Sequence, residues 1–266
     1  MSDESVVLYE KKGPVAFITI NRPAVLNALD LRTHERLGAI WNDYEHDSDL
    51  RVAVLTGAGE RSFSAGQDLK ELAVRIENGA TPSTFGSRGA AGWPRLTERF
   101  TMTKPVVARV NGLAMGGGFE LALACDIIVA AEHAVFALPE AKLGLIPGAG
   151  GLFRLARQLP LRTAVGYLMT GRQMTAKRAL ELGLINAIAP MAELDACVNE
   201  WVADILACSP LSIRAIKDVI ASSANLSLPE AFAARYEWEE KRRSGSDCLE
   251  GPRAFVERRK PQWSNE

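Results

Sequence analysis

Three glycine-rich segments of this chain carry residue types that could hold an anion or move a proton. In the first, the glycines Gly116–Gly118 follow an apolar run and begin a helical pattern, with Glu120 in the first helical turn. The free N–H groups of such a turn, at the positive end of the helix dipole, are suited to an anion or an oxyanion. An alternative stays open, in which Glu120 only complements the dipole and the glycines only allow close packing.

The other two glycine-rich segments could also hold an anion or move a proton. Small residues in Phe63–Leu69 expose backbone N–H groups at the start of another predicted helix, although a simple turn with Asp68 as the helix cap is an alternative. Glu140 lies among apolar neighbours before the glycine-rich turn Pro147–Gly151. A carboxyl in apolar surroundings is a candidate proton carrier, because burial favours its neutral form; a solvated loop glutamate is the alternative.

None of these segments contains a histidine or a nucleophile. The three histidines and four cysteines of the chain show no short ligand spacing, so we expect no metal site. Gly116–Gly118 also lacks the spacing of a dinucleotide-binding loop, so we expect no nicotinamide cofactor. Carboxylates and backbone donors suit a substrate with an acidic Cα–H or a conjugated carbonyl, whose enolate oxygen the N–H groups would hold.

Strands alternate with helices in the first part of the chain, which indicates an α/β fold with crossover connections. A hairpin is predicted from Val6–Tyr9 and Val15–Ile20, and a helix over Leu31–Tyr44 from apolar residues at helical spacing. The other predicted elements are the strands Val52–Leu55, Val106–Val110 and Ile127–Ala131 and the helix Gly117–Cys125.

Two regions depart from this alternation. Glycine and proline crowd Ala73–Thr103, which is either an exposed loop or a segment that lines a pocket. From about residue 190 the pattern becomes entirely helical, so we divide the chain into a core, 1–190, and a helical region, 191–266. The helices predicted there are Ala192–Ala207, Leu211–Ser222, one from a capping box at Ser227 to about Arg242, and Leu249–Arg259.

The composition excludes several classes of partner. With 31 Lys and Arg against 32 Asp and Glu among 266 residues, the net charge of −1 offers no basic face for nucleic acid or anionic lipid. The longest apolar stretch, Leu121–Leu138, is interrupted by charged residues, so no transmembrane helix is expected. Scattered cysteines and an N-terminus without the features of a secretory signal favour a cytoplasmic protein.

Taken in order, these motifs resemble those of the enoyl-CoA hydratase/isomerase (crotonase) superfamily, over nearly the whole chain from Val15 to Trp263. The similarity is specific because several motifs occur in the right order. They are Asn21-Arg22-Pro23, Asn27-Ala28-Leu29, Phe63-Ser64-Ala65-Gly66-Gln67-Asp68-Leu69, Lys104-Pro105, Val110-Asn111-Gly112, Gly116-Gly117-Gly118-Phe119-Glu120-Leu121, Pro139-Glu140 and Pro147-Gly148-Ala149-Gly150-Gly151.

The resemblance implies a spiral of ββα turns followed by a helical trimerisation region, in a trimer or a dimer of trimers. It implies an acyl-CoA substrate whose thioester oxygen is held by the N–H groups of Ala65 and Gly117, with no cofactor beyond the coenzyme A of the substrate. Substrate contacts are implied for Arg22, for Gly66, Gln67 and Asp68 beside the adenine, and for Gly148 near the catalytic water.

Hydratase members carry two glutamates that match Glu120 and Glu140. The resemblance therefore implies reversible syn addition of water to a 2-enoyl-CoA, giving a 3-hydroxyacyl-CoA, and which glutamate acts as acid stays open. Alternatives are an isomerase, a thioester hydrolase, and a catalytically idle or RNA-binding relative.

One branch of the family, the carnitinyl-CoA dehydratases, is similar around Phe136–Gly144 and Glu250–Phe255. Leu138 stands where hydratases of straight-chain substrates often have Gln, and Ala24 removes one possible phosphate contact. A carnitinyl group would need an aromatic or acidic pocket for its quaternary ammonium, for which Trp93 is a candidate.

Overall fold

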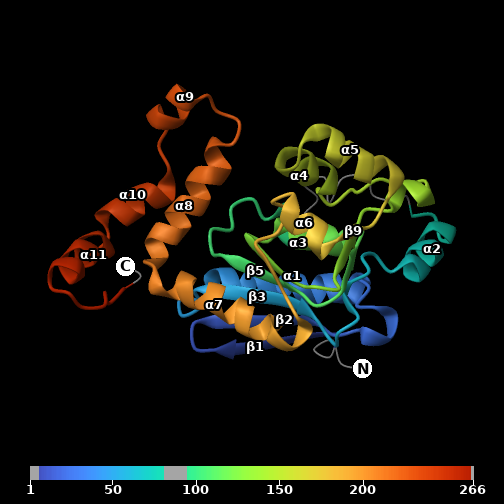
Figure 1. The fold of residues 1–266 in the computed structure, drawn as a ribbon, viewed down its shortest axis with the longest axis horizontal. Coiled ribbons are helices and arrows are strands. Elements are labelled where there is room, and N and C mark those ends of the chain that lie inside the picture. Colours follow the sequence, from blue (N-terminus) through green and yellow to red (C-terminus); the bar gives the residue numbers. More distant parts are fainter. Residues whose placement is uncertain (1–5, 81–94, 265–266) are drawn as a thin grey trace. The chain divides into compact units, whose positions relative to one another are not determined.

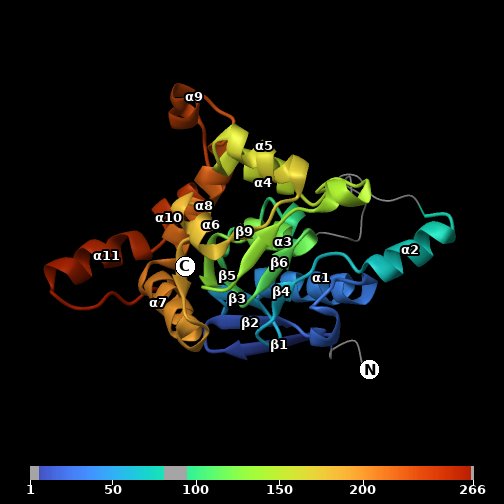
Figure 2. The ribbon, with the colours of Figure 1, turned by 45° about the vertical axis from the view of Figure 1, so that its right-hand side comes forward.

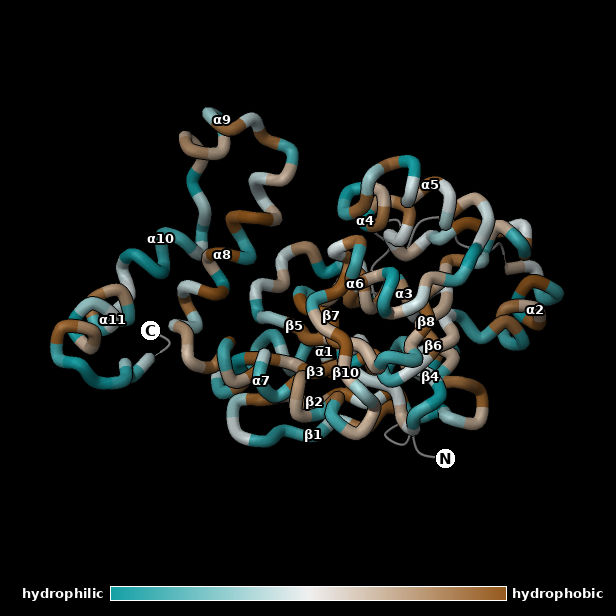
Figure 3. Tube along the Cα trace, viewed as in Figure 1, coloured by the Kyte–Doolittle hydropathy of each residue, from teal (hydrophilic) through white to brown (hydrophobic). Residues whose placement is uncertain are grey.

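The larger sheet begins with the predicted hairpin. In the computed structural model, which describes residues 6–80 and 95–264, β1 (Val7–Lys12) pairs antiparallel with β2 (Val15–Ile20). The other strands of this six-stranded sheet are parallel and follow in the order β3 (Val52–Gly57), β5 (Val106–Val110), β7 (Ile127–Ala131) and β10 (Ala187–Ala189). Figure 3 shows hydrophobic residues along the central strands β5 and β7, as expected for buried strands, and hydrophilic residues along β1 at one edge of the sheet.

A second, four-stranded sheet consists of very short strands that the sequence analysis did not identify. Its order is β4 (Ser62–Ser64), β6 (Leu113–Met115), β8 (Val135–Ala137) and β9 (Met174–Thr175). The first three are parallel and β9 is antiparallel. Two or three residues are too few for a hydrophobic alternation to stand out in a sequence.

The two sheets are connected by a repeated ββα turn (Figures 1 and 2). In each turn a long strand leads to a short strand and then to a helix: β3, β4 and α2 (Leu69–Glu77), then β5, β6 and α3 (Gly117–Ala124), then β7, β8 and α4 (Gly151–Gln158). This confirms the predicted crotonase-like spiral. Because β4, β6 and β8 are parallel, the segments that leave their carboxyl ends gather at one edge of the small sheet.

The helices of this part of the chain follow their sequence signals closely. The predicted first helix is α1 (Leu31–His46), capped by Asp30, whose side chain accepts a hydrogen bond from the Thr33 N–H. Its buried face includes Leu37 and Trp41, at the predicted spacing. The remaining helices are α5 (Leu161–Thr170) and α6 (Ala176–Glu181), with a short 3₁₀ helix, η4, at Glu140–Leu143.

The chain divides into two units, residues 1–99 with 106–199, and residues 100–105 with 200–266. α7 (Leu194–Ala207) crosses the division in sequence. The second unit contains the helices α8 (Pro210–Ser223), α9 (Leu228–Ala233), α10 (Glu237–Ser244) and α11 (Asp247–Val256). Within the described ranges, no helix has the length and apolar character needed to cross a membrane.

The predicted single helix from Ser227 to about Arg242 is wrong. The capping box at Ser227 is present, but α9 ends at Ala233, and the chain is extended at Ala234 and Tyr236 before α10 begins. The interruption brings the N–H of Trp238 within 3.1 Å of Asp218 Oδ2 on α8 and its ring within 3.5 Å of the Arg214 guanidinium carbon. Packing against α8 therefore overrides the local helical pattern.

We expect Gly118→Ala to destabilise the protein, because a Cβ on Gly118 would lie 2.1 Å from the Ser64 carbonyl oxygen. Such overpacking costs about 1–3 kcal/mol. Gly166→Ala in α5 is the matched control: outside the local helix backbone, no atom of the described residues lies within 4 Å of its added Cβ, and the change should stabilise the helix by up to about 1 kcal/mol. Chemical denaturation measures the free energy of unfolding of both variants. Equal changes in the two would contradict the close contact between Gly118 and the Ser64 carbonyl.

Candidate active site

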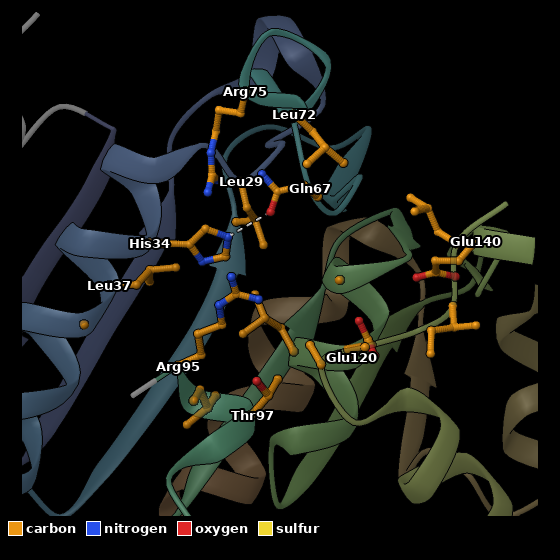
Figure 4. Close-up of a pocket in the computed structure, with 18 of the residues that line it drawn as sticks. Leu29, His34, Leu37, Gln67, Leu72, Arg75, Arg95, Thr97, Glu120 and Glu140 are labelled. Carbon is orange, nitrogen blue, oxygen red and sulfur yellow. Dashed lines mark hydrogen bonds between the residues drawn. The ribbon is translucent and has the colours of Figure 1, made fainter. Parts of the chain in front are cut away.

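The three glycine-rich segments of the sequence meet at the edge where β4, β6 and β8 end. A pocket of about 200 Å³ opens there. From these segments it is lined by Gln67, Gly117, Glu120, Glu140 and Gly148, and Leu29 adds an apolar side chain. Figure 4 shows Glu120 and Glu140 on one side of this pocket.

Two backbone segments touch at the pocket wall, and only glycine fits where they do. A Cβ on Gly66, whose φ is +84°, would lie 2.6 Å from the Met115 carbonyl oxygen and 2.8 Å from the Gly117 nitrogen. On the other side, a Cβ on Gly117 would lie 3.7 Å from the nitrogen of Gln67. The backbone nitrogens of Gln67 and Gly117 are therefore held next to each other.

Both N–H groups are oriented away from secondary-structure partners. Gly117 is the first residue of α3, so its N–H has no partner within the helix. Gln67 forms a parallel bridge with Leu29, in which the Leu29 N–H donates to the Gly66 oxygen and the Asp68 N–H donates to the Leu29 oxygen. In that pattern the Gln67 N–H points to the opposite side, where Gly117 lies.

The expectation for Ala65 as an oxyanion donor is wrong. Its N–H donates to the Leu26 carbonyl oxygen at 2.9 Å and is therefore already engaged. Gln67, two residues later, has its N–H beside Gly117 instead. The sequence motif located the segment that approaches Gly117 but not the residue whose N–H faces it, because the direction of each N–H depends on the bridge to Leu29.

Glu120 is buried, with 3% of its surface exposed. Its Oε1 accepts a hydrogen bond from the Gly151 N–H at 2.8 Å, at the start of α4. Burial, and then the nearby charge of Glu140, raise the pKa of Glu120 to about 7, although the N–H groups of Gly151 and Ala149 act in the opposite direction. This carboxyl can gain or lose a proton near neutral pH.

Glu140 begins η4, directly after Pro139. Burial raises the pKa of this carboxyl too. Its Oε2 is buried and has no hydrogen-bond partner among residues 6–80 and 95–264. A Cβ on Gly116 would lie 3.1 Å from its Oε1, so the glycine at that position leaves room for the carboxyl group. Glu140 thus has one oxygen available for a substrate or a water molecule.

The structure does not place Arg22 and Asp68 in the pocket wall. Nη2 of Arg22 lies 3.1 Å from Oδ2 of Asp68 and 3.1 Å from Oδ2 of Asp30. The Asp68 side chain also accepts hydrogen bonds from the first backbone N–H groups of α2, as the capping alternative predicted. These two residues tie the start of α2 to the segment after β2, and any contact with a substrate would lie outside the pocket.

The pocket also contains polar residues that the sequence analysis missed: His34, Arg75 and Arg95 on the side away from Glu140, and Thr97 between Arg95 and Glu120 (Figure 4). His34 lies three residues before Leu37, so the helical period that identified the buried face of α1 could have found it. Arg75 is on α2, and Arg95 and Thr97 follow the residues that the structure leaves undescribed. The Ala73–Thr103 segment does line the pocket at both its ends, whereas Trp93 lies outside the described residues.

His34 is a neutral side chain in this wall. Burial, and then the positive charge of Arg95, lower its pKa to about 4. Its Nε2 lies 3.4 Å from Oε1 of Gln67. As for metal ions, no group of three or more His, Cys, Asp or Glu side chains in the described part of the chain is arranged to hold one.

We expect Glu120→Gln to raise the melting temperature at pH 8 much more than at pH 5. The pKa of a glutamate side chain is ordinarily 4.5, whereas that of Glu120 in the folded protein is about 7. The contribution of Glu120 to the free energy of unfolding therefore falls as pH rises from about 4.5 to about 7, and it is constant above pH 7. At about 1.4 kcal/mol per pKa unit, the loss is on the order of 3 kcal/mol.

Thermal melts at pH 5 and pH 8 measure the effect of the substitution on the melting temperature at each pH. Any cost of the new amide that does not depend on pH cancels when the two effects are subtracted. Glu132→Gln, which removes a charge at an exposed position, is the control and should show no such difference. Parallel shifts of the Glu120→Gln protein at both pH values would contradict a raised pKa.

Comparison with known proteins shows a similarity that extends over nearly the whole chain. The sequence model for enoyl-CoA hydratase/isomerase matches residues 10–266. A carnitinyl-CoA dehydratase of Salmonella arizonae is 44% identical over 264 residues, covering 95% of this chain and 96% of the relative, and that of Salmonella enteritidis PT4 is 43% identical over the same shares.

Solved structures agree with this similarity. An enoyl-CoA hydratase from Mycobacterium tuberculosis H37Rv has a TM-score of 0.87 at 37% identity, and one from Mycobacterium marinum has a TM-score of 0.88 at 36% identity. Each comparison covers 99% of this chain and 100% of the other. Since sequence and fold match from end to end, this chain belongs to the enoyl-CoA hydratase/isomerase family, in the crotonase superfamily.

Proposed function

We propose that this protein is an enoyl-CoA hydratase, adding water reversibly to a 2-enoyl-CoA thioester to give a 3-hydroxyacyl-CoA. The observation that carries the proposal is the arrangement of two carboxyls with raised pKa values, the buried Glu120 and the half-buried Glu140, beside the adjacent N–H groups of Gln67 and Gly117. A hydratase needs this combination: an oxyanion site for the thioester and two groups that handle the protons of one water molecule.

In this mechanism the thioester carbonyl oxygen accepts hydrogen bonds from the N–H groups of Gln67 and Gly117. As water attacks Cβ, the electron pair of the double bond moves toward that oxygen, and the two N–H groups stabilise the negative charge. Each such donor contributes about 3 kcal/mol to transition-state stabilisation. Glycines that hold the two backbones together therefore have a catalytic consequence.

The two glutamates complete the proton balance. One carboxylate takes a proton from the attacking water, and a carboxyl group delivers a proton to Cα on the same face, so water is added syn and no proton is left over. The negative charge of Glu140 raises the pKa of Glu120, so ionisation of Glu140 favours the protonated form of Glu120. Run in reverse, the same steps remove water from a 3-hydroxyacyl-CoA, and the curated relatives named as dehydratases are consistent with either direction.

We also propose that the protein assembles through its helical region, as a trimer or a dimer of trimers. Several large apolar side chains of the second unit are exposed in the single chain: Ile216, Ile220, Phe232, Leu249 and Phe255. Exposed apolar surface of this kind is typical of a protein interface. Coenzyme A enters only as part of the substrate, and no further cofactor is proposed.

We expect Glu120→Gln and Glu140→Gln each to lower the rate of crotonyl-CoA hydration by about 100-fold or more, because each removes a proton-transfer group. The loss of the conjugated-thioester absorbance measures the rate, and circular dichroism checks that the variants fold. Glu132→Gln is the matched control and should keep full activity.

Two further readouts separate this proposal from the alternatives. Release of free thiol would indicate a thioester hydrolase, and a shifted double bond without a hydroxyl group in the product would indicate an isomerase. Near-normal hydration by both glutamate variants would overturn the proposal.

A further inference from the structure

The pocket wall opposite the two glutamates is charged, which is unusual for a surface that would receive an aliphatic acyl chain. Arg75 and Arg95 both line it, together with the polar side chains of His34, Gln67 and Thr97. Among the described lining residues, the only carboxyls are Glu120 and Glu140, which the proposed function already uses. The side of the pocket away from Glu140 therefore presents two guanidinium groups, and the charge of Glu120 acts on one of them, Arg95.

Arg75 and Arg95 both lie close to the imidazole of His34. In Figure 4 the imidazole of His34 lies between the side chains of Arg75 and Arg95, which reach toward it from α2 and from the segment before Thr97. Both arginines lower the pKa of His34, and Arg95 has the stronger effect. Burial lowers the pKa of Arg95, and the positive charge of Arg75 lowers it further, whereas the negative charges of Glu98 and Glu120 raise it. Mutual repulsion of this kind is relieved when an anion binds between the cations.

Negative groups near this wall do not remove its positive character. Asp30 acts on His34, and Glu98 and then Glu120 act on Arg95; of these three carboxyls only Glu120 lines the pocket. Asp30 is itself occupied by Arg22 and by the backbone and hydroxyl of Thr33. A ligand that enters the pocket therefore meets the arginines and not these carboxylates.

An independent observation is the hydroxyl group of Thr97. Thr97 is 2% exposed, and its Oγ1 is buried with no hydrogen-bond partner within the described part of the chain. Figure 4 shows its side chain between those of Arg95 and Glu120. An unsatisfied buried hydroxyl is costly, and a ligand oxygen in the pocket would satisfy it.

Building on the hydratase proposal, we infer that the acyl group of the substrate carries a carboxylate at its far end, bound by Arg75 and Arg95 with Thr97 as a hydrogen-bond donor. Guanidinium groups bind carboxylates with paired, charge-assisted hydrogen bonds. A neutral His34 can add a further N–H. The substrate class is then an enoyl-CoA made from a dicarboxylic acid.

The same wall is unfavourable for a quaternary ammonium group. Such a cation is usually bound by aromatic rings or carboxylates. Here it would meet two positive charges, and Trp41 is the only Trp, Tyr or Phe among the described lining residues. The substrate named for the carnitinyl-CoA dehydratases is thus a poor match for this chain, despite 44% identity to one of them.

Binding of saturated CoA thioesters to the full-length protein tests the inference without requiring turnover. Glutaryl-CoA, pentanoyl-CoA and 4-trimethylammoniobutanoyl-CoA differ in charge at the far end of acyl groups of similar length. By isothermal titration calorimetry, we expect glutaryl-CoA to bind about tenfold or more tighter than either of the others. Equal affinities, or tightest binding of the ammonium compound, would overturn the inference.

Variants locate the contact. Arg95→Gln, and separately Arg75→Gln, should abolish the preference for glutaryl-CoA while leaving the affinity for pentanoyl-CoA unchanged, and Thr97→Val should reduce the preference. Arg172→Gln removes an exposed arginine outside the pocket lining and should change nothing. If the variant at the half-buried Arg95 does not fold, the variant at Arg75, which is exposed, decides the question.

A uniform loss of affinity for all three thioesters in these variants would show that the arginines bind the phosphates of coenzyme A, and would overturn the inference. The test of the carboxylate-binding inference can fail or succeed independently of the test of the hydratase proposal. Absence of hydration activity in the unmodified protein would overturn the function and leave the binding preference measurable, whereas hydration without a preference for the carboxylate would overturn only the inference.

Discussion

Close contact between two backbone segments is the constraint on which this site depends. Gly66 packs against Met115 and Gly117, and Gly118 packs against the carbonyl of Ser64, at separations that leave no space for a Cβ. Side chains at these positions would push the start of α3 away from the segment after β4. The N–H groups of Gln67 and Gly117 would then no longer be adjacent, and an oxyanion site made from backbone alone has no side chain that could reach across to restore it.

The ββα repeat makes this contact possible and also positions the carboxyls. Parallel strands end at one edge of the small sheet, so the loops after β4, β6 and β8 converge there without needing long insertions. Glu120 lies one turn into α3 and is tied to the first N–H of α4, while Glu140 begins η4. Low solvent access at this edge raises the pKa of both carboxyls, so the fold that aligns the backbone donors also prepares the acid–base pair.

Chemistry and selectivity are supplied by different parts of the fold. The loops at the sheet edge carry the backbone donors and the glutamates, which in the proposed reaction act on the thioester and the double bond shared by every enoyl-CoA. The opposite wall comes from α1, α2 and residues 95–97, and carries the arginines and Thr97. Relatives can therefore keep the backbone donors and the glutamates and differ in the residues of the opposite wall. For this reason high overall sequence identity does not determine which acyl group is bound.

The sequence by itself determined the features that are encoded locally. The hairpin, α1, the glycine-rich helix starts and the two glutamates follow from periodicity, capping residues and motif order, which involve neighbours in the chain. Only the tertiary structure decided the short strands of the second sheet, the interruption before α10, the use of the Ala65 N–H by Leu26, and the meeting of His34, Arg75 and Arg95 at one wall. The physical reason is that hydrogen-bond partners, desolvation and charge proximity depend on residues far apart in the sequence.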